Sequence, residues 1–230
     1  MVLDEPQLSP VTQAIQDYAK AIFSLQQRGG GPVSTNALAE RLGVTPGSVS
    51  AMVKRLHERG LVEHVPYKGV ELTHEGRRVA LEVLRHHRLL ETFLARELGM
   101  PWERVHEEAE VLEHVLSEEL EALIAAKLGH PEVDPHGDPI PSAELVLHEP
   151  ETDCLDAQEP GARGVFVRVS DADPGMLGYL GERGIAPGDR FEVVERQPFG
   201  GPLFVRFGVD DDVHALGGAL TQAMRVELDG

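Results

Sequence analysis

Histidine and glutamate residues recur at helical spacing between residues 87 and 114. His87 and Glu91 are four residues apart, which places both side chains on one face of a helix. A second group follows at steps of four, three and one: His106, Glu110, Glu113 and His114. Because a helix turns by about 100° per residue, this second group falls within about a quarter turn. Imidazole and carboxylate groups that neighbour each other in this way can bind one divalent ion.

This pattern leaves more than one interpretation open. Runs of charge on a helix usually form a solvated face, but here two histidines interleave with the carboxylates and a second His/Glu pair precedes them. A catalytic metal with an open coordination position is a further alternative. The chain has no HExxH, GxSxG or P-loop motif. Catalysis therefore has little support, and we expect a protein that is not an enzyme.

Length and composition limit the class of protein. The chain has 230 residues, of which 41% are hydrophobic and 26% are charged, and this suits two or three domains with buried cores. No apolar run reaches the roughly 18 residues of a membrane span, and the first residues carry no secretory signal. Cys154 is the only cysteine, which excludes a disulfide framework, a zinc ribbon and a CxxC redox motif. We expect a cytoplasmic protein with no membrane partner.

The formal net charge of −18 hides an asymmetry along the chain. Residues 34–90 hold nine Lys or Arg against six Asp or Glu, whereas residues 101–160 hold two against seventeen. Such a difference in charge between two segments indicates which partners each segment can bind. The first segment suits contacts with phosphates, and the second offers many hard oxygen ligands.

A winged helix is predicted at the N-terminus. The first helix begins at Ser9-Pro10 and repeats apolar residues at helical spacing. The second helix covers residues 34–42, and the third covers residues 45–60 with glycine in the turn between them. Two short strands at residues 61–66 and 70–73 form a hairpin, or wing, directly after the third helix. Residues 1–75 are therefore predicted to form a winged helix-turn-helix DNA-binding domain.

The rest of the chain is predicted to hold a helical domain and a small β module. Two helices at about 75–98 and 102–128 have apolar positions at three- and four-residue steps, as in a dimerisation domain over residues 76–145. Residues 146–160 read as a linker. Short strands, with a short helix or turn at residues 175–182, then predict an SH3-like β-barrel over residues 161–230. The expected strands cover residues 164–169, 190–195, 202–207 and 225–228. The fold class is mainly α with small β.

Five stretches, taken together, resemble the diphtheria toxin repressor family of iron- and manganese-dependent transcription regulators. They follow one another within residues 12–141: Gln16-Asp17-Tyr18, LAERLGVTPGSVSAMVKRLHERGLV, HHRLLETFL, VHEEAEVLEHVLSEE and PHGDPIP. The C-terminal part resembles the SH3-like module of three-domain members more weakly. The resemblance implies a homodimeric repressor of metal-uptake genes that binds a palindromic DNA operator, with a metal ion as corepressor.

The resemblance also implies which residues bind metal, at two sites per subunit. It places an ancillary site on the two long helices, at His87, Glu91 and His106. It places a primary site on the first helix and the second long helix, at Asp17, Glu110, Glu113 and His114. Iron-responsive members have Met and Cys at the positions of Asp17 and Glu110, whereas manganese-responsive members have Asp and Glu, as this chain has. Carboxylates make the site harder, which favours Mn²⁺ as the cofactor, with Fe²⁺ as the alternative.

Two positions bear on where the second ion binds. Lys20 stands where manganese-type two-domain members have a glutamate of a two-metal cluster, so the second ion is expected in the ancillary site. In three-domain members the SH3-like module donates a carboxylate and an amide to that site, near Asp173 and Met176 of this chain. Asp173 is therefore predicted as a fourth ancillary ligand, with Asp171 as a nearby alternative, while Met176 is a poor ligand for a hard ion. Turn residues before a helix are the competing interpretation.

The recognition helix begins with small residues and has no Arg, Asn or Gln among its first seven. Such residues predict sparse direct reading of bases and a large contribution from DNA shape. The residues expected to contact the DNA backbone are Thr45, Ser48, Ser50, Lys54, Arg55, Tyr67 and Lys68. Thr45 has a competing role as a helix N-cap.

The expected mechanism follows from charge. Without metal, the carboxylates of Asp17, Glu110 and Glu113 repel one another, and a divalent ion reverses that repulsion. The first helix is then attached to the dimerisation helices, which sets the spacing of the two recognition helices for a palindrome. A winged-helix regulator of a small organic ligand is the rival, and its DNA binding would ignore chelators. The eight other histidines, including His86 and His136, are expected to be ordinary residues.

Overall fold

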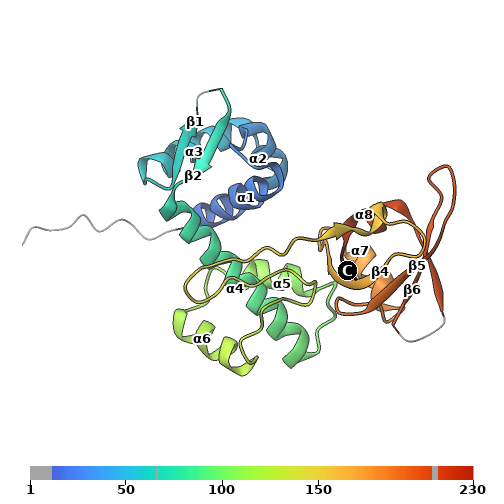
Figure 1. Cartoon of the computed structure of the whole chain (residues 1–230). Helices are drawn as coiled ribbons and strands as arrows, with labels where there is room; N and C mark the ends of the chain where they lie inside the picture. Colours follow the sequence, from blue (N-terminus) through green and yellow to red (C-terminus); the bar gives the residue numbers. More distant parts are fainter. Residues whose placement is uncertain (1–11, 66, 209–211, 230) are drawn as a thin grey trace, which may run out of the picture. The chain divides into compact units, whose positions relative to one another are not determined.

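The computed structural model describes residues 12–65, 67–208 and 212–229 and divides into two compact units, residues 1–85 and 86–230. Figure 1 shows the helical and β parts of the chain in sequence colours. The division falls within helix α4, His74–Leu98, whereas the expected domain boundary lay near its first residue. Each unit is described by itself.

The first unit has the predicted winged-helix elements. They are α1 (Gln13–Gly29), α2 (Thr35–Leu42), α3 (Pro46–Glu58) and an antiparallel hairpin of β1 (Val62–Val65) and β2 (Gly69–Leu72). The side chains of Ser34 and Thr45 accept hydrogen bonds from the backbone at the starts of α2 and α3. The predicted start at Ser9-Pro10 lies outside the described residues, and α1 begins at Gln13.

The wing is held close to the chain that precedes α2. Val33 and Val70 exchange two backbone hydrogen bonds of 2.8 and 2.9 Å. Gly69 has φ of 124°, and a Cβ atom there would lie 2.0 Å from the carbonyl oxygen of Val33. Only glycine fits this conformation and this close approach. The base of the wing is therefore fixed to the helical core, while its tip at Tyr67 is fully exposed.

The second unit begins with helices, and one of them contradicts the sequence prediction. The single helix expected at 102–128 is wrong, because the structure has α5 (Val105–Leu112) and α6 (Glu118–Lys127). Ser117 starts α6 by accepting a hydrogen bond from the backbone of Leu120 at 3.3 Å. Three glutamates lie in the first turn of α6, where the helix dipole favours negative charge. The apolar spacing continues across the break and so concealed it.

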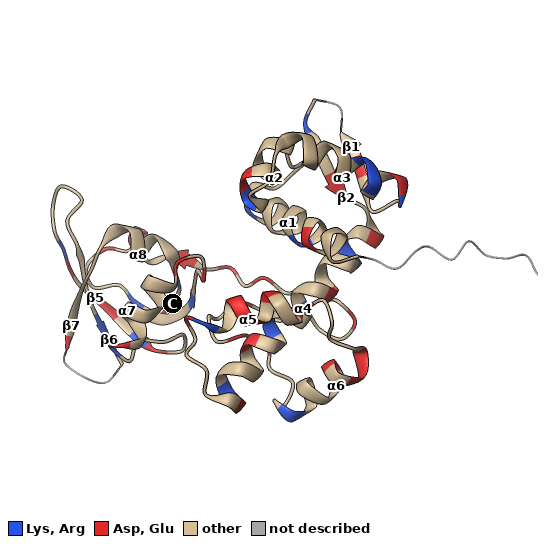
Figure 2. Ribbon diagram, turned by 180° about the vertical axis from the view of Figure 1, so that it is seen from behind, with Lys and Arg blue, Asp and Glu red and all other residues tan. Residues whose placement is uncertain are grey.

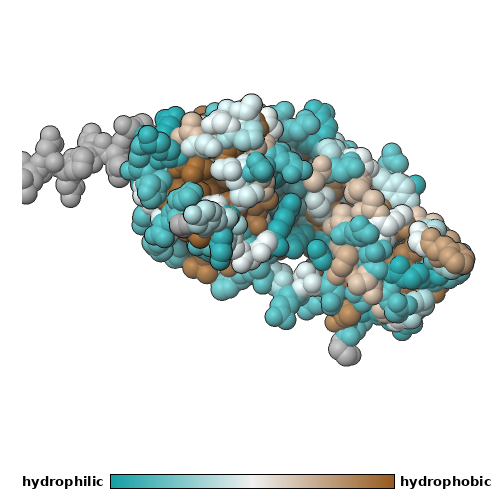
Figure 3. Space-filling view, turned by 90° about the horizontal axis from the view of Figure 1, so that it is seen from above, coloured by the Kyte–Doolittle hydropathy of each residue, from teal (hydrophilic) through white to brown (hydrophobic). Residues whose placement is uncertain are grey.

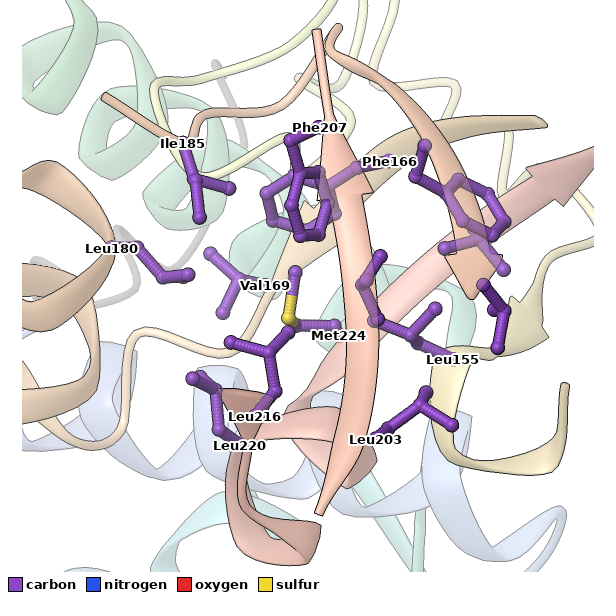
Figure 4. Close-up of a cluster of buried hydrophobic side chains, with 14 of the residues drawn as sticks. Leu155, Phe166, Val169, Leu180, Ile185, Leu203, Phe207, Leu216, Leu220 and Met224 are labelled. Atoms are coloured by element: carbon purple, nitrogen blue, oxygen red, sulfur yellow. The ribbon is translucent and has the colours of Figure 1, made fainter. Parts of the chain in front are cut away.

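The C-terminal part of this unit is a six-stranded antiparallel sheet with order β3-β8-β4-β5-β6-β7. Its strands are Asp153–Cys154, Arg163–Val169, Arg190–Arg196, Leu203–Phe207, Val213–Leu216 and Met224–Leu228, numbered β3 to β8 in chain order. Helices α7 (Pro174–Gly181) and α8 (Gly218–Ala223) accompany the sheet. The four predicted strands and α7 are present, whereas β3, β7 and α8 were not predicted. Side chains from strands and both helices meet in one apolar core (Figure 4).

The expected linker at 146–160 is partly wrong. Strand β3 pairs with β8, and the short 3-10 helix η1 (Leu155–Ala157) follows it. Leu155 is completely buried in the core of the sheet, so the β module begins near residue 153 rather than at 161. A two-residue strand is too short to show periodicity, and only the isolated apolar Leu155 marked this segment.

On the face of the molecule seen in Figure 3, hydrophilic residues in teal surround patches of hydrophobic residues in brown. Within residues 12–65, 67–208 and 212–229, no helix is both long and apolar enough to cross a membrane.

Candidate metal centre

A cluster of four metal-ligating side chains lies inside the second unit. Helix α4 presents His87 and Glu91, which are 3% and 1% exposed, and α5 presents His106. Nε2 of His87 lies 2.9 Å from Oε1 of Glu91, and Nδ1 of His106 lies 3.2 Å from the same oxygen. Asp171 completes the cluster, with Oδ2 at 2.9 Å from Nδ1 of His106. Ligand atoms of all four residues lie within 4.8 Å of one another.

The structure corrects the aspartate that the β module contributes. The side chain of Asp173 accepts a hydrogen bond from the backbone of Gly175 at 2.9 Å and so caps α7. Met176 packs against the apolar core of the sheet. Asp171, the alternative, lies at the cluster because it follows the end of β4 by only two residues. Asp173 therefore has a local role as the cap of α7, whereas Asp171, in the turn that precedes α7, lies at the cluster.

A second group of ligands adjoins the first through the other nitrogen of the His87 ring. Nδ1 of His87 lies 2.5 Å from Oε2 of Glu113 and 4.0 Å from Oε1 of Glu110. Oε1 of Glu113 lies 3.5 Å from Nε2 of His114. The side chain of Glu113 is fully buried, whereas that of Glu110 is 44% exposed. Helix α4 and the C-terminal end of α5 thus bring Glu110 and Glu113 close to His87, and His114 adjoins Glu113. Asp17 lies half-buried on α1 of the other unit, so its part in this site stays a prediction.

Sequence reasoning missed a third group, which comes from the loop after α6. Ligand atoms of Glu91, Asp134 and His136 lie within 4.8 Å of one another, and all three residues are buried. Nε2 of His136 donates to the backbone carbonyl of Trp102 at 2.9 Å. Nδ1 of His136 is buried 3.7 Å from Oε2 of Glu91, and no hydrogen-bond partner for it lies among the described residues. The only signal was the stretch DPHGD at residues 134–138, which places a histidine between two aspartates.

His86 also differs from expectation. Its side chain is buried, with Nδ1 at 3.1 Å from the backbone carbonyl of Glu113 and Nε2 at 2.9 Å from Oε2 of Glu121. The residue therefore connects α4 to α5 and α6. It faces away from the cluster at His87, as neighbouring residues on a helix do.

Burial and mutual charge set the protonation of the cluster. Burial alone would raise the pKa of Glu91, but the charge of His87, hydrogen bonds from His106 and His87, and the nearby imidazole of His136 hold that pKa well below its usual value. Hydrogen bonds to Asp171 and Glu91 raise the pKa of His106 to about 10. Burial would lower the pKa of His136, yet the nearby carboxylate of Glu91, with its negative charge, raises it to about 9. Burial opposes ionisation of Asp171, but His106 lowers its pKa to about 2.

These residues fit a hard divalent cation. Nε2 of His87, Oε1 of Glu91 and Nδ1 of His106 form a triangle with edges of 2.9, 3.1 and 3.2 Å. Metal–ligand bonds of about 2.1 Å at right angles put neighbouring ligand atoms about 3 Å apart. Oxygen and imidazole ligands with no sulfur suit Mn²⁺ and Fe²⁺. The buried Nδ1 of His136 is a further nitrogen, with no hydrogen-bond partner in the described part of the chain.

The DNA-binding candidates are exposed on the first unit. Thr45, Ser48, Ser50, Lys54 and Arg55 are exposed along α3, and Lys68 is exposed in the wing. Oγ1 of Thr45 accepts from the backbone of Ser48 at 3.2 Å, so Thr45 does cap α3. Ser50 donates to the carbonyl of Pro46 at 3.0 Å. Contact with DNA by these residues stays a prediction. Figure 2 shows where Lys and Arg lie in this unit, in contrast to the acidic α5 and α6 of the other.

Comparison with known protein families follows the same division of the chain. The model for the iron dependent repressor N-terminal DNA binding domain matches residues 10–70. The model for the iron dependent repressor metal binding and dimerisation domain matches residues 73–142. The FeoA domain model matches residues 154–228, which agrees with a β module that starts before residue 161.

Relatives that align along most of the chain are also named as repressors or metal regulators. The iron-dependent repressor IdeR of Mycobacterium tuberculosis strain H37Rv is 32% identical over 210 residues, covering 86% of this chain and 90% of that protein. The diphtheria toxin repressor of Corynebacterium efficiens is 32% identical over 190 residues, covering 78% and 82%. A solved manganese-dependent transcriptional repressor in complex with manganese has 45% identity and a TM-score of 0.85, covering 94% of this chain and all of that one. The structure of the manganese regulator SloR has 30% identity and a TM-score of 0.73, covering 96% and 100%.

Together the fold and these matches define a winged-helix, metal-dependent DNA-binding transcriptional repressor. The chain belongs to the diphtheria toxin repressor family of iron- and manganese-dependent transcription regulators.

Proposed function

We propose that this chain is a Mn²⁺-activated repressor of metal-uptake genes that binds a palindromic operator as a homodimer, with two metal sites per subunit. The observation that carries the metal assignment is the ligand set. The clusters around His87 contain only carboxylates and imidazoles. Cys154 lies in β3 of the sheet, where its thiol donates weakly to the carbonyl of Thr221. Hard oxygen ligands favour Mn²⁺ over softer ions.

The matched proteins support manganese and also keep iron as the second candidate. Solved relatives are named manganese-dependent, and one of them, ScaR, has structures with Zn²⁺ and with Cd²⁺. IdeR is named iron-dependent at 32% identity. Affinity for divalent ions rises from Mn²⁺ to Fe²⁺ at almost any site, so ligand type biases selection without excluding iron.

In this proposal one ion is held by His87, Glu91, His106 and Asp171, with His136 and Asp134 beside them. The other is held by Glu110, Glu113 and His114, with Asp17 from the first helix. A bound divalent ion supplies positive charge that offsets the repulsion among these carboxylates. Asp17 belongs to the DNA-binding unit, so its attachment biases that unit toward the arrangement that fits DNA.

The dimer in this proposal uses the face of α5 and α6. Large apolar side chains are exposed there on the isolated chain: Val111, Leu112, Val115, Leu120 and Leu123. An apolar face of this kind is characteristic of a subunit interface. Two-fold pairing would place one copy of α3 at each half-site of a palindromic operator.

The experiment that tests the proposal is anaerobic DNA binding by fluorescence anisotropy. A labelled duplex is first selected from a random pool with both Mn²⁺ and Fe²⁺ present. The metal-free protein is then titrated with each ion, alongside an Asp17→Met/Glu110→Cys double variant. We expect Mn²⁺ to activate the wild type at the same or a lower free concentration than Fe²⁺, and the variant to shift toward Fe²⁺. Far better activation of the wild type by Fe²⁺ assigns it to iron, and no response to either ion contradicts the corepressor role.

A further inference from the structure

One imidazole ring lies between the two metal sites. Nε2 of His87 faces the first group, at 2.9 Å from Oε1 of Glu91 and 3.1 Å from Nδ1 of His106. Nδ1 faces the second group, at 2.5 Å from Oε2 of Glu113. The side chains of His87 and Glu113 are 4% and 0% exposed, so water does not screen this contact. A change at either nitrogen is therefore transmitted to the other site through one rigid ring.

The two nitrogens differ in what they are placed to do. The distances around Nε2 match neighbouring ligands of one ion, which lie about 3 Å apart. The 2.5 Å between Nδ1 and Glu113 is too short for an ion to have both atoms as neighbouring ligands, and it suits a charge-assisted hydrogen bond. A ring nitrogen that binds a cation carries no hydrogen, so the hydrogen of a neutral ring is then on the other nitrogen.

We infer that His87 couples the two metal sites, with Nε2 binding the ion held by Glu91, His106 and Asp171 while Nδ1–H donates to Glu113. This hydrogen bond holds the Glu113 carboxylate in position for the second ion, which Glu110 and His114 also bind. His87 is thus a ligand of one site and a positioning residue of the other. The inference rests on the proposed function, because it requires that both groups bind metal.

Glu113 also acts, through His87, on the ion at Nε2. A carboxylate that accepts from a metal-bound imidazole raises the basicity of that ligand, and loss of such a partner typically lowers metal affinity 10- to 100-fold. Binding couplings are reciprocal, so whatever factor the ion at Nε2 contributes to binding of the second ion, the second ion contributes to binding of the first. Glu113 should therefore affect the affinity of a site that it does not coordinate.

Nitrogen NMR of the wild-type chain tests which nitrogen binds. Protein labelled with ¹⁵N-histidine receives one equivalent of ¹¹³Cd²⁺ as a diamagnetic probe, and the His87 signals are assigned with His87→Gln. We expect one-bond coupling to cadmium at Nε2 of His87 and a retained hydrogen on Nδ1. Coupling at Nδ1, or coupling at other histidines only, overturns the inference while the proposed metal binding stands. Coupling at no histidine contradicts the proposed sites themselves, and the inference with them.

A matched pair of variants tests the energetic link. Glu113→Gln removes the charge that faces Nδ1, and Glu108→Gln removes a charge from an exposed position on α5, which ends directly before Glu113. We expect the first Cd²⁺ to bind about tenfold more weakly to Glu113→Gln and within twofold of wild type to Glu108→Gln, measured by competition with a chromophoric chelator. Equal weakening in both variants, or none in Glu113→Gln, overturns the coupling. Retained ¹⁵N signals of His106 and His136 would show that the variants keep the fold of the cluster.

Discussion

Glu91 uses its two carboxylate oxygens on different partners. Oε1 faces His87 and His106, whereas Oε2 lies 3.7 Å from Nδ1 of His136. A buried carboxylate is stable in its charged form only when it is paired in this way. In the metal-free chain, the three imidazoles supply the positive charge that balances the Glu91 carboxylate. Exchange of protons for a metal ion is therefore the chemistry for which this group of residues is arranged.

The correction from Asp173 to Asp171 gives a direct test at single residues. Asp171→Asn removes a charged ligand beside His106, so we expect affinity for Mn²⁺ to fall at least tenfold. Asp173→Asn should leave it unchanged, since asparagine also caps helices well. Competition with a chromophoric chelator measures both. Equal losses in the two variants would contradict the assignment of Asp171.

The raised pKa values of His106 and His136, about 10 and about 9, predict how metal binding depends on pH. Both imidazoles are protonated at neutral pH and must lose a proton to bind a cation. Metal affinity should therefore rise with pH until about pH 9–10, with protons released on binding. Calorimetry of Mn²⁺ binding at pH 7 in two buffers with different ionisation enthalpies measures that release. Identical heats in both buffers would contradict it.

The same groups affect the stability of the metal-free chain with the opposite trend. Their folded pKa values lie above the ordinary histidine value of 6.5, so their stabilising effect is complete below pH 6.5 and is lost as pH rises through 9–10. Asp171, with a lowered pKa of about 2, stabilises above its ordinary value near 3.8 and loses that effect as pH falls toward 2. Urea unfolding in the presence of a chelator should show that these groups contribute most to the free energy of unfolding between about pH 4 and 6.5. A midpoint that rises from pH 7 to 10 would contradict the assignment.

At the scale of elements, the loop after α6 is fixed by close contact with strand β4. Val169 donates a backbone hydrogen bond to the carbonyl of His136 at 2.9 Å. The side chain of Asp134 accepts from the backbones of His136 and Asp138 at 2.8 and 2.9 Å. These bonds hold the loop backbone without using the imidazole. The ring of His136 is thereby left to face Glu91.

Gly137 permits this contact and gives a prediction for the loop. It has φ of 88°, and a Cβ atom there would lie 1.9 Å from the carbonyl oxygen of Val167. Gly161 has φ of 94° with open space around it, so Gly161→Ala tests backbone strain alone. We expect Gly161→Ala to cost about 1–2 kcal/mol and Gly137→Ala about 3 kcal/mol or more in free energy of unfolding. Metal affinity should fall only in Gly137→Ala. If the two variants lost equal stability in urea unfolding and equal affinity in metal titration, the close contact at Gly137 would be unimportant.

Local patterns predicted some elements well and missed others for physical reasons. Capping residues and glycine stops marked α2 and α3, and long apolar periodicity marked α4. The leucine spacing from 112 to 123 keeps a helical period through the break between α5 and α6, so periodicity alone could not show it. His136 and Asp134 join Glu91 through a loop more than forty residues away. Such a contact depends on tertiary packing, which spacing within a helix does not record.

The whole molecule unites binding of metal, of DNA and of a second copy, and a surface variant can separate these properties. Leu123 is 60% exposed on α6, within the segment matched by the metal binding and dimerisation domain, and it is not among the metal-ligating groups. In a dimer, Leu123→Asp would bury one charge from each subunit against the apolar face of its partner, which costs several kcal/mol without compensation. We expect a monomer by analytical ultracentrifugation and DNA binding weakened at least a hundredfold, because one recognition helix cannot read two half-sites.

Metal binding distinguishes this outcome from simple unfolding of the variant. Leu123→Asp should keep the wild-type affinity and stoichiometry for Mn²⁺, since its cluster on α4, α5 and the β module lies within one chain. Val194→Asp adds the same charge at an exposed apolar position on β5 and should keep both the dimer and DNA binding. A monomeric variant that still binds the selected duplex with full affinity would show that pairing is not required. A variant that loses metal together with DNA would instead indicate that the substitution unfolds the chain.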